Sequence, residues 1–573
     1  MRTTTALTCL PVLAALALGV GSCNKNASPT PPSLAIASGY VEPTTPIDVA
    51  TAPKLGITTL SATVFERPSR SAKKLGYLRL GALVARDAKP AGTEGCPGGF
   101  YRIAPRGYVC AGEDATLDIQ NPVVRAASIR PDITRPLPYR YVFVRSVAPQ
   151  YLRVPKKEEQ IASEFKLKEN LAFWSRKGHA ASKVTAGAND VDAPGLPKPA
   201  RLSTEQTFGE LFGAQTGALH PKTDGEGFDP IPFWLQGGRK IPNVSSFTVP
   251  PYAVFANRVR RHTGLAVVSA FTTGPENLDR AFAVTTDLRL VPVSKLKPDS
   301  ASTFHGVELR EGAQRLPLAF VVGKGCERSP AECVRSYTLS GETMKRGEAF
   351  AYRQVLSLTG KGKKVGATWY REVAGGSFVK AADVRVAEES SEKPPVAARG
   401  EKWIDVSIEN QTLVLWEGNT PVYATLVSTG QDGLGDPKTS KSTPRGTFRI
   451  KTKHVTATMD SNEKSAHAGG SGGASEREHA VDAKDGEEGK TVRRGQGLFE
   501  LRDVPWVAYF DAGYALHAAY WHDVFGKPRS HGCVNLSPID AHRVFGWTEP
   551  RLPDGWHGVA AGDKDGTVVV VRK

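Results

Sequence analysis

One heptapeptide decides how this chain is interpreted, and it reads Ser530-His531-Gly532-Cys533-Val534-Asn535-Leu536. A cysteine with an ordinary pKa of about 8.5 is only a few per cent thiolate at neutral pH, so it needs a base to act as a nucleophile. His517 precedes Cys533 by 16 positions. A histidine, with a pKa of about 6.5, is suited to take that proton and later return it to a leaving amine. The pattern therefore predicts an acyl-transfer site with Cys533 as nucleophile and His517 as general base.

The residues next to Cys533 have expected roles of their own. Gly532 lets the backbone approach a substrate closely, and the amides of Gly532 and Cys533 are expected to face a developing oxyanion. His531 is a second candidate for the base. Cys533, His517 and His531 are also good zinc ligands, but no CxxC or HExxH spacing accompanies them. We therefore expect no metal at this site.

The sequence around this site is typical of β hairpins. Apolar and polar residues alternate over 404–409, which predicts a half-buried strand. Asn410-Gln411 turns the chain, residues 412–416 return it, and Thr443-Pro444-Arg445-Gly446-Thr447-Phe448 opens a further strand. We expect hairpins of a β sheet here rather than βαβ units.

Together these features resemble the L,D-transpeptidases of the YkuD type. The resemblance is carried by the heptapeptide 530–536, by His517 and by the Thr443-Pro444-x-Gly446-x-Phe448 strand, with further support in the stretch 504–526. It covers residues 402–573, and it implies a β-sandwich-like catalytic domain.

The resemblance also implies a reaction and roles for residues. Cys533 would form a thioacyl-enzyme at the third residue of a peptidoglycan stem peptide, a diaminoacid, with release of the terminal D-alanine. An amine of another stem would then accept the acyl group, which gives a 3→3 crosslink. Ser530, His531 and Asn535 would shape the site together with Gly532. No metal or organic cofactor is implied.

Two features depart from the family pattern. Ala518 follows His517 where the family more often has Gly or Ser, so no side-chain hydroxyl can orient the imidazole and we expect a backbone carbonyl to do so. A polar insert at 461–494 stands where the family has a loop near the substrate cleft. The insert is either a mobile lid or disordered filler, and its composition favours filler.

Three alternatives to crosslinking remain open at this point. Water can replace the acceptor amine, which would make the protein an L,D-carboxypeptidase or a hydrolase of peptides linked to the wall. A second alternative is a non-catalytic scaffold that binds the cell wall, but the presence of both Cys533 and His517 argues against it. Nucleic-acid binding through the net charge of +16 is disfavoured, because the basic residues are scattered and the chain carries an export signal.

The N-terminus has the pattern of an exported, lipid-anchored protein. Residues 1–22 combine a positive end, a short apolar run and small residues, as in a signal peptide. Val20-Gly21-Ser22-Cys23 resembles a bacterial lipobox, which predicts lipidation at Cys23. Residues 23–54 are rich in Pro, Ser and Thr and are expected to be a tether on the periplasmic side. Asn24 in place of Asp favours the outer membrane.

The other cysteines fit an oxidising compartment. Cys96 and Cys110 are expected to form one local disulfide, and Cys326 and Cys333 a second. Cys533 is then left as the working thiol.

Length and composition predict a mainly β, multidomain protein. The chain has 573 residues, of which 40% are hydrophobic and 23% charged, so it is long enough for three or four folded domains. Short alternating runs and a repeated aromatic-aromatic-Arg pattern resemble small SH3-like β barrels. The expected order is an SH3-like domain, an unclassified middle region, a possible second SH3-like domain, a linker and the catalytic domain, at 55–120, 121–315, 316–388, 389–401 and 402–573.

Overall fold

The computed structural model describes residues 45–169, 171–172, 230–244, 249–250, 252–299, 301–310, 314–326, 329, 333–390, 392–460, 500–562 and 564–573. All of them belong to one compact unit, Thr45–Lys573. The predicted signal peptide, Cys23, the first part of the tether and the 461–494 insert lie outside the described residues. Within the described part, no helix is both long and apolar enough to cross a membrane.

The first described segment is a small β unit with its own core. Its strands are β1 (Lys54–Ile57), β2 (Ser61–Phe65), β3 (Lys74–Arg79), β4 (Leu83–Ala85), β5 (Phe100–Arg102), β6 (Tyr108–Cys110) and β7 (Ala115–Thr116). The order β4-β1-β7 forms one sheet, while β3, β2, β6 and β5 follow one another in a second. Cys96 and Cys110 are joined by a disulfide. The comparison with SH3-like barrels stays a prediction.

The middle region is a curved set of antiparallel strands with short helices. It contains α1 (Pro122–Ala126), β8 (Arg140–Val144), β9 (Ala148–Tyr151), α2 (Lys157–Ser163), η1 (Phe233–Leu235), β10 (Phe255–Val259), β11 (Gly264–Thr272), η2 (Pro275–Asn277), β12 (Ala281–Thr285), β13 (Leu290–Pro292), η3 (Val293–Lys295) and β14 (Leu296–Pro298). Helix α2 is attached to these strands by a buried polar network.

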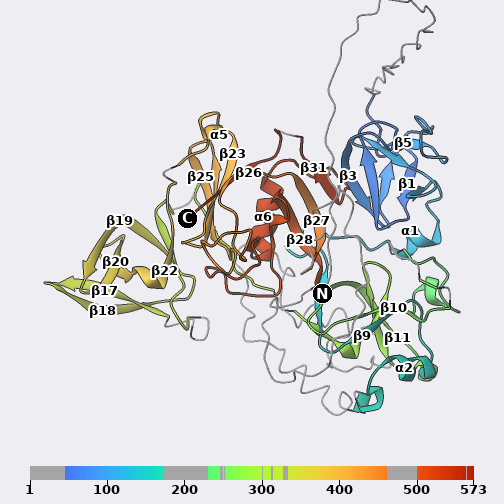
Figure 1. The fold of residues 1–573 in the computed structure, drawn as a ribbon, viewed down its shortest axis with the longest axis horizontal. Helices are drawn as coiled ribbons and strands as arrows, with labels where there is room; N and C mark the ends of the chain where they lie inside the picture. Colours follow the sequence, from blue (N-terminus) through green and yellow to red (C-terminus); the bar gives the residue numbers. More distant parts are fainter. Residues whose placement is uncertain are drawn as a thin grey trace, which may run out of the picture. The chain divides into compact units, whose positions relative to one another are not determined.

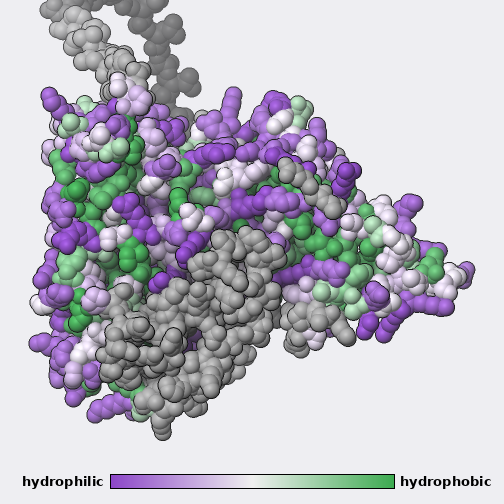
Figure 2. Space-filling model, turned by 180° about the vertical axis from the view of Figure 1, so that it is seen from behind, coloured by the Kyte–Doolittle hydropathy of each residue, from purple (hydrophilic) through white to green (hydrophobic). Residues whose placement is uncertain are grey.

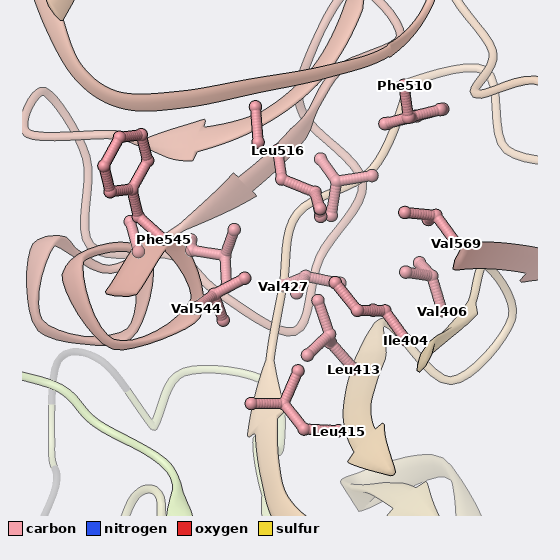
Figure 3. Close-up of a cluster of buried hydrophobic side chains, with 14 of the residues drawn as sticks. Ile404, Val406, Leu413, Leu415, Val427, Phe510, Leu516, Val544, Phe545 and Val569 are labelled. Atoms are coloured by element: carbon pink, nitrogen blue, oxygen red, sulfur yellow. The ribbon is translucent and has the colours of Figure 1, made fainter. Parts of the chain in front are cut away.

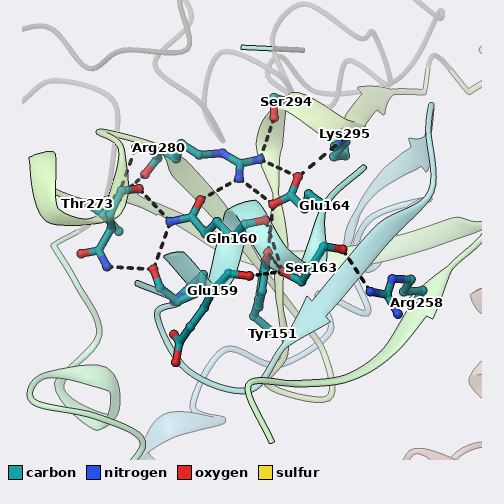
Figure 4. Close-up of polar contacts among 12 residues, drawn as sticks. Tyr151, Glu159, Gln160, Ser163, Glu164, Arg258, Thr273, Arg280, Ser294 and Lys295 are labelled. Atoms are coloured by element: carbon teal, nitrogen blue, oxygen red, sulfur yellow. Dashed lines mark hydrogen bonds and ion pairs between the residues drawn. The ribbon is translucent and has the colours of Figure 1, made fainter. Parts of the chain in front are cut away.

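That network centres on Arg280 and Glu164, whose side chains are almost fully buried (Figure 4). The guanidinium lies 2.6 Å from the carboxylate and also donates to Gln160 Oε1 at 2.7 Å and to Ser294 Oγ at 3.2 Å. Tyr151 donates to the same carboxylate at 3.0 Å. Buried polar groups that find partners in this way make the packing of a region specific and rigid.

A second β unit follows. Its elements are β16 (Leu318–Val321), β17 (Val334–Ser340), β18 (Thr343–Phe350), β19 (Val355–Val365), β20 (Thr368–Val373), β21 (Phe378–Lys380), η4 (Ala381–Asp383) and β22 (Val384–Ala387). They form a seven-stranded sheet in the order β18-β17-β21-β20-β19-β16-β22. Cys326 and Cys333 form the second disulfide. We call this segment the β16–β22 unit.

The C-terminal domain is built from two sheets and one main helix. Its elements are α5 (Pro395–Ala398), β23 (Lys402–Ser407), β24 (Thr412–Glu417), β25 (Thr420–Leu426), β26 (Gly446–Arg449), β27 (Thr452–Asp460), β28 (Glu500–Asp511), β29 (Tyr514–Ala518), β30 (Val534–Leu536), α6 (Pro538–Trp547), β31 (Gly558–Ala560) and β32 (Val568–Arg572). One sheet runs β25-β24-β23-β32-β26, extended by β15 (Val307–Glu308), and the other contains β31, β27, β28, β29 and β30. The prediction of a mainly β, multidomain protein is confirmed.

The core of this domain lies between the two sheets (Figure 3). Ile404 and Val406 on β23 meet Phe510 and Leu516 of the second sheet in one buried cluster, and Phe545 of α6 joins them. The expectation that the strand predicted at 404–409 is only half-buried is wrong.

The reason is that the outer face of β23 is also covered. Asp405 and Ser407 are both 1% exposed. Trp403, on the same side, packs in a second cluster with Phe304 and Phe320, which lie in the connection before the β16–β22 unit and in that unit itself. Asp405 can remain buried because Arg572 donates to both of its carboxylate oxygens, at 2.9 and 3.1 Å.

One hydrogen-bonded sheet continues through three parts of the chain (Figure 1). The middle region joins through β11, which lies parallel to β28 at Gly264 and Leu501. The first β unit joins through β3, where Tyr77 pairs with Gly558 of β31. The second sheet of the C-terminal domain is therefore extended by the first β unit at its β31 edge, and the middle region joins it beside the start of β28. On the face drawn in Figure 2, hydrophilic side chains predominate and hydrophobic ones are interspersed among them.

Candidate active site

The candidate site is built on two neighbouring parallel strands, β29 and β30. His517 of β29 lies directly opposite Asn535 of β30. Cys533 immediately precedes β30, two residues before Asn535. Because side chains alternate along a strand, Cys533 and Asn535 point to the same side of the sheet as His517. The register thus brings the predicted nucleophile and base to one face.

The imidazole of His517 is held in a defined orientation. The side chain is 2% exposed, and Nδ1 lies 3.0 Å from the Ala518 carbonyl oxygen. A carbonyl can only accept, so Nδ1 carries the proton and donates it, which leaves Nε2 as the basic nitrogen. This contact is the backbone carbonyl expected from the absence of a hydroxyl at position 518. The ring also stacks on Trp521, with centroids 5.7 Å apart.

Burial sets the charge of His517. Desolvation lowers its pKa to about 4, and the hydrogen bond to Ala518 opposes this shift without cancelling it. The imidazole is therefore neutral at pH 7. A neutral imidazole with a free Nε2 is the form that can accept the proton of a thiol.

Cys533 is half-buried and is the one described cysteine outside a disulfide. Its thiol donates to the carbonyl of Gly513 at 3.6 Å, in the turn between β28 and β29. Cys533 also packs at the edge of a cluster that contains Tyr141 of the middle region and Tyr520. The middle region thus contributes side chains to the cluster on which Cys533 packs.

Ser530 organises the loop that precedes the nucleophile. Its hydroxyl donates to the carbonyl of Cys533 and accepts the Gly532 N–H at 3.1 Å. Its backbone bonds to Thr429 and Gln431 on a neighbouring segment, at 3.0 and 2.9 Å. The Gly532 amide thus has Ser530 as its acceptor in this structure, and its oxyanion role stays a prediction.

Gly532 is required by space and by backbone conformation. Its φ is +129°, in a region that side chains disfavour. A Cβ at this position would lie 2.4 Å from Cε1 of Tyr514, whose hydroxyl donates to the Pro437 carbonyl at 3.3 Å. The glycine therefore lets the nucleophile loop pass directly under the Tyr514 ring.

His531 lies in the same loop and is half-buried. Burial lowers its pKa to about 4, nearby Lys441 lowers it further, and Asp432 opposes both. Both of these charged residues belong to the 431–442 segment, which follows the strand-like contact of Gly430 with Ser530. His531 is thus half-buried near the charged residues Lys441 and Asp432, whereas His517 is buried on the strand next to β30.

His522 also contributes to the site, through a contact that the sequence alone did not predict. Its Nε2 lies 3.1 Å from the side-chain amide of Asn535, and both residues are buried. Its pKa lies well below the usual value because of burial, with Arg529, His517 and Arg353 adding to the effect. His522 is five residues after His517, in the connection that follows β29. No spacing rule signals such a contact, because it depends on how the connection folds back onto β30.

The described residues contain no group of three or more His, Cys, Asp or Glu side chains placed to hold a metal ion. The arrangement as a whole, a thiol and a neutral histidine on one face of a β sheet, is chemically suited to acyl transfer.

The family comparison agrees with this chemistry. Residues 401–571 match the family model YkuD, described as the L,D-transpeptidase catalytic domain. The resemblance predicted from the heptapeptide is thus confirmed for residues 401–571. A search of curated proteins finds no significant match to the chain.

Solved structures that are similar to the chain include L,D-transpeptidases from several bacteria. A crystal structure of a mutant Enterococcus faecium L,D-transpeptidase is 19% identical over 30% of this chain and 49% of that one, with a TM-score of 0.19. An L,D-transpeptidase from Mycobacterium smegmatis is 16% identical over 47% of this chain and 100% of that one, with a TM-score of 0.20. L,D-transpeptidase 3 from Mycobacterium tuberculosis, in complex with a faropenem-derived adduct, is 16% identical over 47% and 97%, with a TM-score of 0.20. The chain therefore spans about half the length of the first of these proteins.

Proposed function

We propose that this protein is a peptidoglycan L,D-transpeptidase that forms 3→3 crosslinks through a thioacyl-enzyme on Cys533. The observation that carries the proposal is the register of β29 and β30, which sets His517 and Cys533 on one face while Ala518 fixes the imidazole. The match of residues 401–571 to the L,D-transpeptidase catalytic domain supports the substrate class.

The proposed reaction has two halves. Nε2 of His517 takes the thiol proton as Sγ of Cys533 attacks the carbonyl carbon at the third residue of the donor stem. The bond to the terminal D-alanine breaks, and the histidine returns the proton to the departing amine. An amine of a second stem then attacks the thioester, and the thiol is restored. No other co-reactant is needed.

The proposal includes the location of the protein. The lipobox-like Val20-Gly21-Ser22-Cys23 supports a lipid anchor at Cys23. The folded part of the chain would then lie on the periplasmic side, and Asn24 in place of Asp favours the outer membrane. The tether of residues 23–54 would let an anchored enzyme reach nearby peptidoglycan.

Mass spectrometry of the products tests the function. The chain from residue 24 onward is incubated with a purified disaccharide-tetrapeptide, beside its Cys533→Ala variant. A crosslinked dimer lacking one alanine, absent with the variant, is the expected result. A shortened monomer would mean that water is the acceptor and that the enzyme is a carboxypeptidase. The same products from Cys533→Ala would reject the thioacyl mechanism, and no product from either would favour a scaffold or another substrate.

A further inference from the structure

The connection between His517 and Cys533 is hydrogen-bonded to the β16–β22 unit, which lies far from it in the sequence. Parallel neighbouring strands such as β29 and β30 need a crossover, and here it runs through residues 519–529 to the nucleophile loop. This crossover carries His522, which contacts Asn535 opposite His517. Anything that fixes the crossover therefore acts on the face where the thiol and the base lie.

Arg353 makes the first contact between the β16–β22 unit and the crossover. It lies between β18 and β19, and its Nη2 donates to the Asp523 carbonyl at 3.1 Å and also to the Asp523 carboxylate. The guanidinium covers the ring of Phe304 at 4.6 Å, and Phe304 stacks on Phe525 of the crossover at 6.1 Å. Arg353 has a φ of +65°, a backbone conformation that persists for a non-glycine residue only where the surroundings impose it.

Arg385 makes a second, independent contact three residues farther along the crossover. This residue of β22 donates from Nε to the Gly526 carbonyl at 2.8 Å and from Nη1 to the Val384 carbonyl at 3.0 Å. On its other side, the Gly526 N–H donates to Val427 of the catalytic domain at 2.9 Å. A Cβ on Gly526 would lie 3.1 Å from Val322 of the β16–β22 unit, so the crossover and this unit are in close contact here.

We propose that the β16–β22 unit acts as a clamp on the crossover, and that Arg353 and Arg385 are positioning residues for the Cys533/His517 site. This inference rests on the proposed function for its meaning in catalysis. The clamp holds residues 523–526, which flank His522 on its C-terminal side and so keep its ring on the Asn535 amide.

The clamp gives the β16–β22 unit an intramolecular role. Active sites lose rate steeply when a reacting group is displaced by even about 1 Å. A charge-assisted hydrogen bond from an arginine to a carboxylate or carbonyl is among the stronger polar contacts that can prevent such a displacement. The unit would then be part of the enzyme's working core, whether or not it also binds the wall.

Alkylation of Cys533 tests the clamp without any peptidoglycan substrate. The full chain and its Arg353→Ala and Arg385→Ala variants are treated with iodoacetamide across a pH series, and modification at Cys533 is followed by peptide mass spectrometry. We expect both variants to shift the pH profile of alkylation and to lower kcat on the tetrapeptide by about tenfold or more, with a smaller change in KM. Arg353→Lys should recover part of the rate, because it keeps the positive charge and can still donate hydrogen bonds.

Arg346→Ala is the matched control. Arg346 is an exposed residue of β18 in the same unit, and its removal should leave the alkylation profile and kcat unchanged. If Arg353→Ala does not fold, Asp523→Asn tests the ion pair, because it keeps the side-chain size and the carbonyl contact. If Arg385→Ala does not fold, Arg385→Lys tests the contact with the Gly526 carbonyl.

Folded variants with wild-type alkylation profiles and wild-type kcat would overturn the clamp. A shifted alkylation profile in a protein that never crosslinks tetrapeptides would support the clamp and reject the proposed function, so the two failures are distinguishable.

Discussion

Arg79 and Asp503 form an ion pair at which three parts of the chain meet. Nη2 of Arg79, at the end of β3 in the first β unit, lies 2.7 Å from Oδ1 of Asp503 in β28. Thr286 of the middle region donates to the other carboxylate oxygen at 2.6 Å and accepts from Arg79 at 3.0 Å. Asp503 is nearly buried, so it depends on these partners.

Removing Arg79 should therefore destabilise the assembled unit. Arg79→Met leaves the Asp503 carboxylate without its cation, and breaking a buried pair in this way costs about 3–5 kcal/mol. Urea unfolding followed by tryptophan fluorescence measures the loss. Arg399→Ala is the control, because Arg399 pairs with Glu401 on the surface and its loss should cost less than about 0.5 kcal/mol. Equal effects of the two substitutions would contradict the structural importance of the pair.

Local patterns predicted much of the C-terminal domain. The alternation at 404–409 predicts a strand, and β23 occupies Lys402–Ser407. The run His531-Gly532-Cys533, which places a histidine, a glycine and a thiol next to one another, is likewise a local signal. What the alternation could not show is that Asp405 lies under another layer, because the residues of that layer, such as Phe320, are distant in sequence.

The contacts of the site that the sequence did not predict also depend on residues that are distant in sequence. Two of these contacts form only when separate segments fold together: that of His522 with Asn535, and the hydrogen bond of Arg353 to Asp523. Nothing in the residues around Arg353 distinguishes it from the many scattered basic residues of the chain. The hydrogen bond of the Gly532 amide to Ser530 was not predicted for a related reason, since the sequence does not show which acceptor an amide finds.

Lipidation should occur at Cys23. Cells grown with labelled palmitate are expected to incorporate the label into the protein, and Cys23→Ala should abolish incorporation and release the protein from the membrane fraction. Cys9→Ala is the control, because Cys9 lies in the predicted signal peptide and its loss should leave labelling intact. A Cys23→Ala protein that stays bound to the membrane would contradict the anchor.

A carbapenem should acylate Cys533, as the resemblance to the YkuD-type enzymes implies. Intact-mass analysis is expected to show one adduct on the wild-type chain and none on Cys533→Ala. His517→Ala should slow adduct formation by about a hundredfold or more, because it removes the group that accepts the thiol proton. An unmodified wild-type protein would count against a competent nucleophile.

Gly532→Ala should abolish the proposed crosslinking activity. The added methyl would clash with the Tyr514 ring. The alanine would also have to adopt a backbone φ of +129°, which costs about 1–3 kcal/mol in strain. Both effects would displace the nucleophile loop. Gly546→Ala is the matched control, because Gly546 lies within α6 with open space around its Cβ position, and alanine there should stabilise the helix by about 0.5–1 kcal/mol. Initial rates and melting temperatures of both variants provide the measurement, and an active Gly532→Ala enzyme would show that the loop tolerates displacement.

Activity should persist at an unusually acid pH. The general base works only when it is deprotonated, and the fraction deprotonated rises with pH through the pKa. Because burial lowers the pKa of His517 from about 6.5 to about 4, most of the imidazole remains a base at pH 5. The acid limb of kcat/KM is therefore expected near pH 4.

Acid unfolding has to be separated from this titration. A histidine with a lowered folded pKa contributes stability that is present above about pH 6.5 and is lost as the pH falls through about 4, because the unfolded chain binds the proton more tightly. Rates are therefore measured only where melting curves show a folded protein, and samples returned to pH 7 must regain full activity. Under those conditions a kcat/KM midpoint at about 6.5 would mean that the base is solvated in the working enzyme, and a midpoint near 4 would match the buried imidazole next to the Ala518 carbonyl.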